Sequence, residues 1–364
     1  MNYYALLVAL VLVTALVMRG YQEKNLKYVI VACLLLFSIY GLRNTYYLGS
    51  DAKTSYLGNF WRTRDRSWSE VIAAANGTNT LFHLMTKFFC VFISYEDYQL
   101  YVSLIAVFVT ICFGRLIYKY SPNPLQSILY HFGLLFFTFH FSAFKQSIAM
   151  AILMLAFDQI IERKPVKFIL LVILAGQFHF PAMVFLPAYW FAKIKLGRSY
   201  LIVMALVLVI TYVFRNQILY FMNSLYREEA EFVDLSDVRF LRTKALIMVI
   251  IVVAAVVFRV PTGEDRVYEI LLQFMSMAIV FQTFCGYNNT FERLADYYFQ
   301  FSVIFLPMVF DKHANRESLL SQQFLEVADT AAPYIFCGYG IYRFLSVVTN
   351  DANLYPFYFF FQSK

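Results

Sequence analysis

The segment Phe141–Tyr189 reads FSAFKQSIAMAILMLAFDQIIERKPVKFILLVILAGQFHFPAMVFLPAY. It contains two apolar stretches of helix length, 143–161 and 167–191, and each is compatible with a lipid bilayer. An ionisable residue at the centre of a spanning helix costs roughly 2.5–3.5 kcal/mol, so membrane proteins keep one mainly where it faces a cavity or a partner. Lys145 near the start of the first stretch and His179 within the second are therefore the first candidates for a functional site.

The composition is typical of a membrane protein. Of the 364 residues, 61% are hydrophobic and 15% are charged, and the mean hydropathy is +0.61. A soluble domain of this size needs more polar surface, so we expect a polytopic membrane protein. The net charge of +7 is expected to reflect Lys and Arg in cytoplasmic loops. Nucleic acid is therefore not expected as a partner.

Motifs of soluble enzymes are missing from the sequence. It has no P-loop, GxSxG, HExxH or dinucleotide fingerprint, and no residues have metal-ligand spacing. The cysteines lie at unrelated spacings in or beside apolar runs and are expected to be small buried residues: Cys33, Cys90, Cys112, Cys285 and Cys337. We therefore expect neither a metal nor a cofactor.

The apolar runs predict an all-α polytopic transmembrane bundle of about 10–12 spanning or partly spanning helices. We expect a single integral membrane domain over 1–364. The runs fall at about 3–18, 26–42, 98–118, 125–140, 143–161, 167–191, 199–214, 243–258, 268–285, 293–310 and 331–349. An amphipathic segment at 79–94 is treated as non-spanning. Gly176 and Pro181 interrupt the run 167–191, which predicts a broken helix that dips into the membrane as a hairpin and returns.

The distribution of Lys and Arg sets the orientation, because short cytoplasmic loops carry the excess of positive charge. With the N-terminus outside, every short basic loop faces the cytoplasm, as does the polar stretch 311–330. Two long loops, at about 43–79 and 215–243, then face outward. The run 3–18 has no basic segment before it and no small-residue cleavage site after it, so a first spanning helix is expected there and not a signal peptide.

On this topology the remaining ionisable residues converge on the outer side. They are Arg43, Asp51, Arg62, Arg64, Arg66, Lys145, His179, Arg239, Arg242, Lys244, Arg293 and Asp296, with Tyr297 beside the last. The planar fork of Arg can bind phosphate oxygens in pairs, and Lys adds a point charge. Such a cluster suits an anionic ligand. A lipid-linked pyrophosphate would fit, with its head group in the cavity and its tail in the bilayer.

The candidates also have purely structural interpretations. Lys145 could snorkel from a helix end, and His179 could bond a backbone carbonyl freed by the helix break. Arg293 and Asp296 could form an ion pair across one helical turn, and Asp51 could shape a turn. The cations of the first outer loop could be interfacial or solvated: Arg43, Arg62, Arg64 and Arg66. Packing is expected for His83, His131 and His140, and Arg343 receives no role.

Four segments, at 41–60, 143–157, 174–189 and 291–301, together resemble conserved segments of the EpsG/Wzy-type polysaccharide polymerases. GLRNTYYLGSDAKTSYLGNF (41–60) resembles their early "GLR … G-T-D … Y … F" segment, and AFKQSIAMAILMLAF (143–157) their "R-Q-x-I-A" helix. LAGQFHFPAMVFLPAY (174–189) resembles their "A-x-x-F-H-x-S-A-x-x-x-L-P-x-Y" segment, and FERLADYYFQF (291–301) a late Arg-then-Tyr helix.

The chain departs from the family's pattern at three positions. Lys145 stands where Arg is usual, which keeps the charge but loses the bidentate fork. Pro181 stands where Ser is common, and Asn79 stands where an acidic residue is often found.

The resemblance implies a multi-pass enzyme of the bacterial cytoplasmic (inner) membrane. Such an enzyme joins oligosaccharide repeat units carried on undecaprenyl pyrophosphate into capsule, exopolysaccharide or O-antigen, by glycosyl transfer on the outer face. A chain-length regulator and a flippase would be possible partners. Arg43, Lys145 and Arg293 would neutralise the departing pyrophosphate, and Gln146 and Tyr297 would join them in substrate binding. His179 or Asp51 would take the acceptor proton, with His179 preferred for its near-neutral pKa.

Three other classes of function stay open on the sequence. A lipid-linked oligosaccharide transporter, or flippase, would also need a basic cavity, although two similar halves are expected of it. An O-antigen ligase would share the leaving group, and a sugar O-acyltransferase is a related possibility. A structural member of a polysaccharide-export assembly would tolerate loss of Lys145 and His179.

Overall fold

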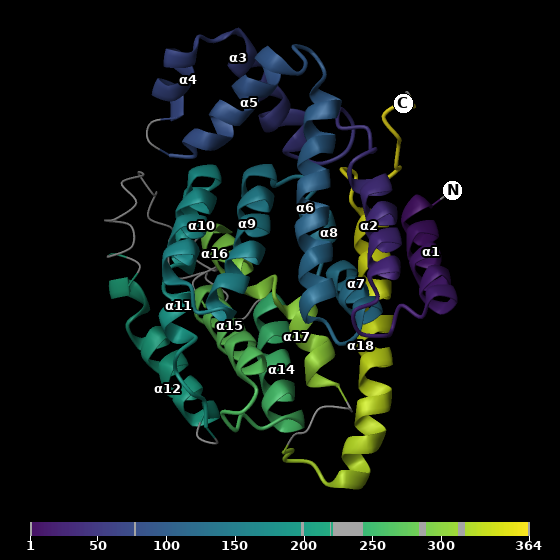
Figure 1. Cartoon of the computed structure of the whole chain (residues 1–364), viewed down its shortest axis with the longest axis vertical. Helices are drawn as coiled ribbons and strands as arrows, with labels where there is room; N and C mark the ends of the chain where they lie inside the picture. Colours follow the sequence, from purple (N-terminus) through teal and green to yellow (C-terminus); the bar gives the residue numbers. More distant parts are fainter. Residues whose placement is uncertain are drawn as a thin grey trace. The chain divides into compact units, whose positions relative to one another are not determined.

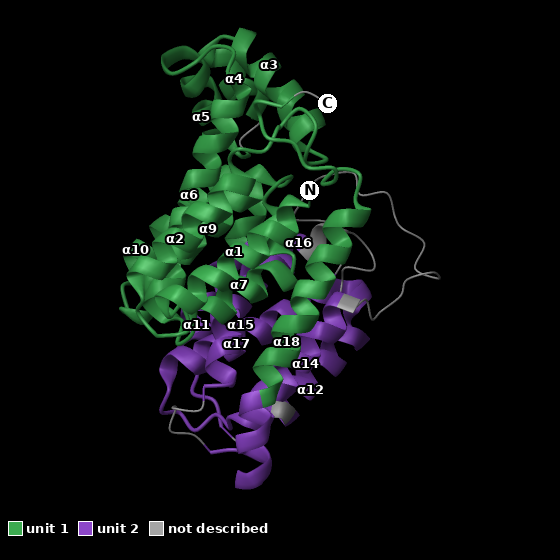
Figure 2. Ribbon diagram, turned by 90° about the vertical axis from the view of Figure 1, so that its right-hand side faces the viewer, with its two compact units in different colours: residues 1–183, 331–364 green, residues 184–330 purple. Residues whose placement is uncertain are grey.

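The computed structural model describes residues 2–75, 78–197, 200–218, 220, 243–283, 289–311 and 317–362. In these ranges the regular elements are helices, and one isolated bridge joins Arg43 to Phe359. The all-α prediction is therefore confirmed for the part of the chain that the structure describes. The helices form two compact units, Met1–Met183 with Ala331–Lys364, and Val184–Thr330 (Figure 2). The expectation of one integral domain over 1–364 stays a prediction.

The first unit contains most of the predicted N-terminal helices. Its elements are α1 (Tyr3–Met18), α2 (Leu26–Tyr40), the π-helix η1 (Ala52–Tyr56), α3 (Leu57–Asp65), α4 (Trp68–Ala75), α5 (Thr80–Phe92), α6 (Tyr98–Tyr120), α7 (Pro124–Gly133), α8 (Phe136–Phe139), α9 (Phe144–Ile161) and α10 (Pro165–Phe178). The 3₁₀ helix η2 (Phe180–Phe185) and α18 (Gln322–Asn350) each contain residues of both units.

Local capping explains where several of these helices begin. A backbone N–H in the first turn of α1, α2, α6 and α7 donates to the side chain of Asn2, Asn25, Asp97 and Asn123, respectively. Such caps satisfy donors that have no partner within the helix. Pro124 and Pro165 stand at the starts of α7 and α10, where a missing N–H costs no hydrogen bond.

The helix α9 forms the centre of the first unit. It packs against α6 and α10, and its apolar residues are buried around the whole circumference, as expected of a helix without a polar face. By length and composition, α6 and α9 could cross a membrane, whereas the other apolar helices have 10–17 residues. The total of about 10–12 spanning or partly spanning helices stays a prediction.

The stretch 43–79, predicted as a long loop, contains short helices. It contains η1, α3 and α4, and apolar side chains of these elements, such as Phe60 and Val71, are buried in the unit. Its outward location stays a prediction. Of the second predicted long loop, 215–243, residues 219 and 221–242 lie outside the described residues.

Two predicted helices are divided in the structure. The run 125–140 breaks where Leu135 adopts a left-handed φ of 66°, between α7 and α8. The run 293–310 breaks at Gln300–Phe301, between α16 (Asn289–Phe299) and α17 (Ser302–Val309). The predicted polar loop 311–330 is helical from Gln322 onward. The helix α18 therefore begins nine residues before the last predicted apolar run, 331–349.

The second unit is also helical. Besides α16 and α17 it contains α11 (Ala188–Phe191), α12 (Tyr200–Val213), α14 (Thr243–Phe258) and α15 (Arg266–Gln282). Asp265 caps α15 by accepting from the N–H of Tyr268 at 3.0 Å. The helix α15 packs against α14, α16 and α17, so it is the core helix of this unit.

Arg343, which had no role on the sequence, has a structural one. Its Nη1 donates to the carbonyl oxygen of Gly133 at 2.6 Å, where α7 ends. A Cβ on Gly133 would lie 2.6 Å from Cα of Gly340, so the two glycines let α7 and α18 approach closely. Arg343 therefore satisfies a carbonyl at the C-terminal end of α7.

Candidate functional site

Two antiparallel helices bring the leading candidates to one end of the first unit. The helices α9 and α10 pack against each other and are joined by the short connection Glu162–Lys164. The start of α9, with Lys145, therefore lies at the same end as the close of α10, with His179. Figure 1 shows α3, α4 and α5 next to this end of α9 and α10.

Lys145 is a half-buried cation at the N-terminus of α9. Its backbone N–H donates to Oη of Tyr56 at 3.3 Å, which satisfies a donor that Ala143, at the N-cap position, leaves without a side-chain partner. Its Nζ lies 5.2 Å from the ring centroid of Phe82. No carboxylate of the described chain is within ion-pair distance of Nζ. The ammonium charge is thus uncompensated by an acid, and the helix N-terminus adds to the positive potential.

His83 lies close to Lys145, and the sequence interpretation missed it. Burial lowers the pKa of His83 to about 4, and the charges of Lys145 and Arg66 act in the same direction. His83 is therefore neutral near pH 7. The sequence placed it among packing residues, and the one local signal was its position four residues after Asn79, which directly precedes α5.

His179 lies at the predicted helix break, which the structure confirms. α10 ends at Phe178, His179 is extended with φ −149°, and η2 follows from Phe180. The N–H of Phe180 donates to Oδ1 of Asn79 at 2.9 Å. Asn79 therefore ties the start of α5 to the chain just after His179. The hairpin that the run 167–191 is expected to form in the membrane stays a prediction.

We call Tyr56, Asn79, His83, Lys145 and His179 the Lys145 cluster. Four different elements or their ends contribute to it: η1, α5, α9 and α10. The cluster combines one ammonium group, two imidazoles, a phenol and an amide. It lies where the apolar helices α9 and α10 have their common end, and it is suited to hold an anion beside a group that can exchange a proton.

Arg43 has a different environment from the one expected. Its side chain is 0% exposed, with Nη2 donating to the carbonyl oxygen of Phe141 at 2.7 Å and Nη1 to that of Tyr40. Its guanidinium also lies 4.5 Å from the ring centroid of Phe141. Burial lowers the pKa of Arg43 to about 10, so it is still protonated near pH 7. Arg43 holds the end of α2 to the segment that precedes α9.

Asp51 follows in the same segment and is half-buried. Gly49, two residues earlier, has φ +92°, and a Cβ there would lie 2.5 Å from the carbonyl oxygen of Phe141. Oγ of Ser50 donates to Oγ of Ser142 at 3.2 Å. Asp51 stands before η1, and its side chain makes no cap hydrogen bond. The segment therefore packs on the residues before α9, and η1 brings Tyr56 to Lys145.

The neighbouring candidates are core residues of the first unit. Gln146 is buried in α9. His140 shares a hydrogen bond between Nδ1 and Oγ of Ser147 at 2.8 Å, and His131 stacks on Phe113 with ring centroids 4.0 Å apart. His131 and His140 therefore pack inside the unit, as the sequence suggested.

The late candidates belong to the second unit. Arg293 is exposed on α16, and Tyr297, one turn later, is fully buried. Oδ1 of Asp296 forms an ion pair with Nζ of Lys244 at 2.6 Å. Arg239 and Arg242 lie outside the described residues. The convergence of Arg293 and Tyr297 with the first unit stays a prediction.

The opposite end of α9 has a buried acid with several cations. Asp158 pairs with Arg115 and with Lys119, the latter at 2.9 Å, and accepts from Oη of Tyr120 at 2.6 Å. This network uses basic residues of the predicted cytoplasmic side, and its charges are compensated. Among the described residues, no group of three His, Cys, Asp or Glu side chains could hold a metal ion.

Comparison with known proteins identifies the family. No curated protein and no solved structure matches the chain significantly. The sequence model of the EpsG family matches residues 26–357, a range that contains the whole Lys145 cluster as well as Arg43, Asp51, Arg293 and Tyr297. This match covers nearly all of the chain, and the protein belongs to the EpsG family.

Proposed function

We propose that the protein polymerises oligosaccharide repeat units linked to undecaprenyl pyrophosphate, forming capsule, exopolysaccharide or O-antigen on the outer face of the bacterial cytoplasmic membrane. The observation that carries this proposal is the Lys145 cluster. It holds an ammonium without a carboxylate partner, at a helix N-terminus, in a chain of the EpsG family. Both features favour a phosphate-bearing ligand.

The proposed reaction is a glycosyl transfer. A hydroxyl oxygen of one lipid-linked unit attacks the anomeric carbon of the saccharide on another. The bond between that carbon and the pyrophosphate oxygen breaks, and lipid pyrophosphate leaves with the electron pair. The acceptor hydroxyl gives its proton to a base of the protein.

Lys145 is the residue that would neutralise the leaving group. Negative charge develops on the pyrophosphate as the bond breaks, and a positive charge fixed in advance lowers the barrier most where solvent is excluded. Lys145 is half-buried, and the axis of α9 adds its positive end. Gln146, Arg293 and Tyr297 are the further substrate-binding residues of the proposal.

Arg43 contributes indirectly in this proposal. Its guanidinium is fully buried and donates to two backbone carbonyls, so it is a positioning residue for the segment before α9. Its loss would move Lys145 together with that segment.

The proposed base is His179, with Asp51 as the alternative. His179 lies directly after α10 with extended backbone, at the same end of the helix pair as Lys145. His83 is a second imidazole near Lys145, and its low pKa reflects burial first and then repulsion by Lys145 and Arg66. A bound pyrophosphate would offset that repulsion and raise the proton affinity of His83.

The proposal is tested by the surface polysaccharide of a deletion strain, separated as a size ladder. The strain is complemented with wild type, Lys145→Ala, His179→Ala or, as a matched control, Lys167→Ala, which removes an exposed Lys from the far end of α10. We expect single displayed repeats in the deletion strain and in both cluster variants, and a full ladder with Lys167→Ala, at equal protein levels.

Other outcomes separate the rival functions. Repeat units trapped inside the cell would instead indicate a transporter. Full-length polymer that is not joined to its acceptor would indicate a ligase. A full ladder with both cluster variants would contradict the assignment of the site.

A further inference from the structure

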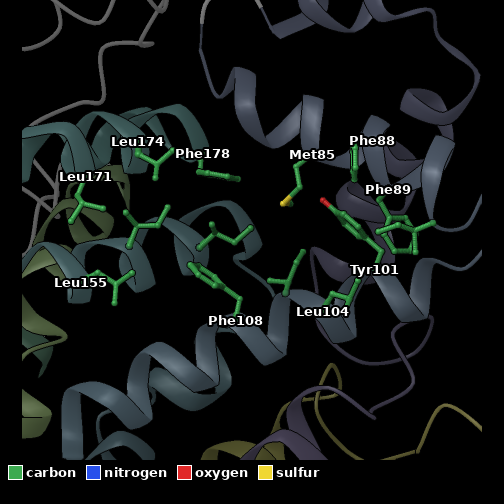
Figure 3. A pocket seen from close by; sticks show the side chains of 14 residues that line it. Met85, Phe88, Phe89, Tyr101, Leu104, Phe108, Leu155, Leu171, Leu174 and Phe178 are labelled. Carbon is green, nitrogen blue, oxygen red and sulfur yellow. The ribbon is translucent and has the colours of Figure 1, made fainter. Parts of the chain in front are cut away.

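An apolar cavity lies within the first unit, directly beside the Lys145 cluster. It has a volume of about 450 Å³ and is lined by residues of α5, α6, α9 and α10, a size within the range of small-molecule sites. Its lining is apolar in every part except the hydroxyl of Tyr101, which is hydrogen-bonded to Oγ1 of Thr86 at 2.7 Å. Figure 3 shows Leu171, Leu174 and Phe178 of α10 on one side of this cavity, and Phe108 of α6 across from them.

The cavity begins where the polar cluster ends. Ile148, which lines it, follows Lys145 on α9 by three residues, and Phe178 directly precedes His179. From Ile148 to Leu155 the lining of α9 rises by seven residue steps, or about 10 Å along the α-helix. A cation and an elongated apolar space are therefore joined end to end.

We propose that this cavity binds the isoprene units nearest the pyrophosphate of the polyprenyl carrier. The proposal rests on the proposed function, because it assumes a lipid pyrophosphate at Lys145. The Lys145 cluster and the cavity together complement both parts of such a lipid. The anionic head requires the ammonium, and the first apolar units of the tail must then lie within one helical turn of it, where this cavity begins.

The apolar lining also favours binding of an isoprenoid tail. Leu174 and Phe108 are exposed apolar residues at the cavity, and contact with an apolar chain gives them packing partners. The hydroxyl of Tyr101 already has a partner, so no polar group of the lining is left unsatisfied by an apolar occupant.

The test is photolabelling of the purified full chain in liposomes. The probe is a long-chain polyprenyl pyrophosphate with a diazirine on one of its first isoprene units, and labelled positions are mapped by mass spectrometry. Variants are Leu174→Trp and Leu155→Trp, which fill the cavity from α10 and from α9. Ile173→Trp is the control, because Ile173 is exposed like its neighbour Leu174 but does not line the cavity.

We expect labels on α9 and α10 at the lining positions, reduced at least fivefold by Leu174→Trp or Leu155→Trp and unchanged by Ile173→Trp. Unlabelled polyprenyl pyrophosphate should compete, and excess phospholipid should not. Labels elsewhere, equal labelling of all variants, or equal competition by phospholipid would overturn the proposal. Labelling needs no sugar and no turnover, so this failure is distinct from a failure of the polymerase assignment, which the size ladder reports.

Discussion

Substitution of Arg43 by Lys separates a structural from a chemical role for this buried cation. The guanidinium is 0% exposed and donates to the carbonyl oxygens of Tyr40 and Phe141 through different nitrogens. Lys keeps the charge, but its single ammonium on a flexible stem does not reproduce the rigid fork. We expect one of the two carbonyls to lose its donor.

The magnitude follows from that lost bond. A hydrogen bond from a charged donor contributes about 1.5–3 kcal/mol, and a buried carbonyl without a partner costs a similar amount. Arg43→Lys should therefore lower the free energy of unfolding by about 1.5–3 kcal/mol. The measurement is unfolding in mixed detergent micelles at increasing fractions of sodium dodecyl sulfate, followed by circular dichroism.

The matched control is Arg62→Lys. Arg62 is exposed, and its Nε donates to the carbonyl oxygen of Gly58 at 3.2 Å, so its replacement should change the free energy of unfolding by no more than about 0.5 kcal/mol. If Arg43→Lys unfolds together with wild type but fails to make polymer, Arg43 acts on the substrate and the positioning role is refuted.

Three further predictions concern stability. His83 has a pKa of about 4 against a usual 6.5, so the stability that depends on neutral His83 is fully present above about pH 6.5 and is lost as the pH falls toward 4. The unfolding midpoint should therefore drop between pH 6.5 and pH 4, and His83→Gln should make this drop smaller. A pH profile that is the same in wild type and His83→Gln would contradict the prediction. Asp158→Asn removes the negative charge that pairs with Arg115 and Lys119, and it should lower the free energy of unfolding by about 1–3 kcal/mol in the same assay. The control Glu162→Gln changes an exposed acid and should lower it by no more than about 1 kcal/mol. Equal losses for the two variants would contradict the prediction. Gly49→Ala places a Cβ on a residue with φ +92° and against the carbonyl oxygen of Phe141, and it should lower the free energy of unfolding by about 1–3 kcal/mol. Gly58→Ala is the control, because Gly58 is helical and has open space around it, and it should be neutral or stabilising by up to about 1 kcal/mol. Equal stability of Gly49→Ala and wild type would contradict the prediction.

The long apolar helices were accessible from the sequence, because their signal is local. The bounds of α1, α9 and α14 agree closely with the runs 3–18, 143–161 and 243–258. The break at His179 was also predicted, since Gly176 and Pro181 each disturb the helical hydrogen-bond ladder. A short connection makes the two helices α9 and α10 antiparallel, which places Lys145 and His179 at the same end of the helix pair.

The parts that were missed depend on contacts between distant segments. α3 reads LGNFWRTRD, a basic stretch whose buried residue Phe60 gives only a weak periodic signal. The break at Leu135 depends on a left-handed backbone that Leu rarely adopts.

The cation environments were missed for the same reason. The carbonyl of Phe141 that accepts from Arg43 lies 98 residues further along the chain. A pattern of charges predicted the same outward end for many cations, but burial and nonlocal partners distinguish Arg43 from Lys145.

The central claim is that the charge of Lys145 stabilises a departing lipid pyrophosphate. Its most direct test is turnover by purified protein in liposomes containing a synthetic lipid-pyrophosphate-linked repeat unit, with released lipid pyrophosphate and joined saccharides measured together. We predict that wild type releases one lipid pyrophosphate per bond formed. Lys145→Met should lower kcat at least a hundredfold, and Lys145→Arg should keep most of it. Equal kcat for Lys145→Met and wild type, or release of lipid pyrophosphate without joined saccharides, would contradict the account.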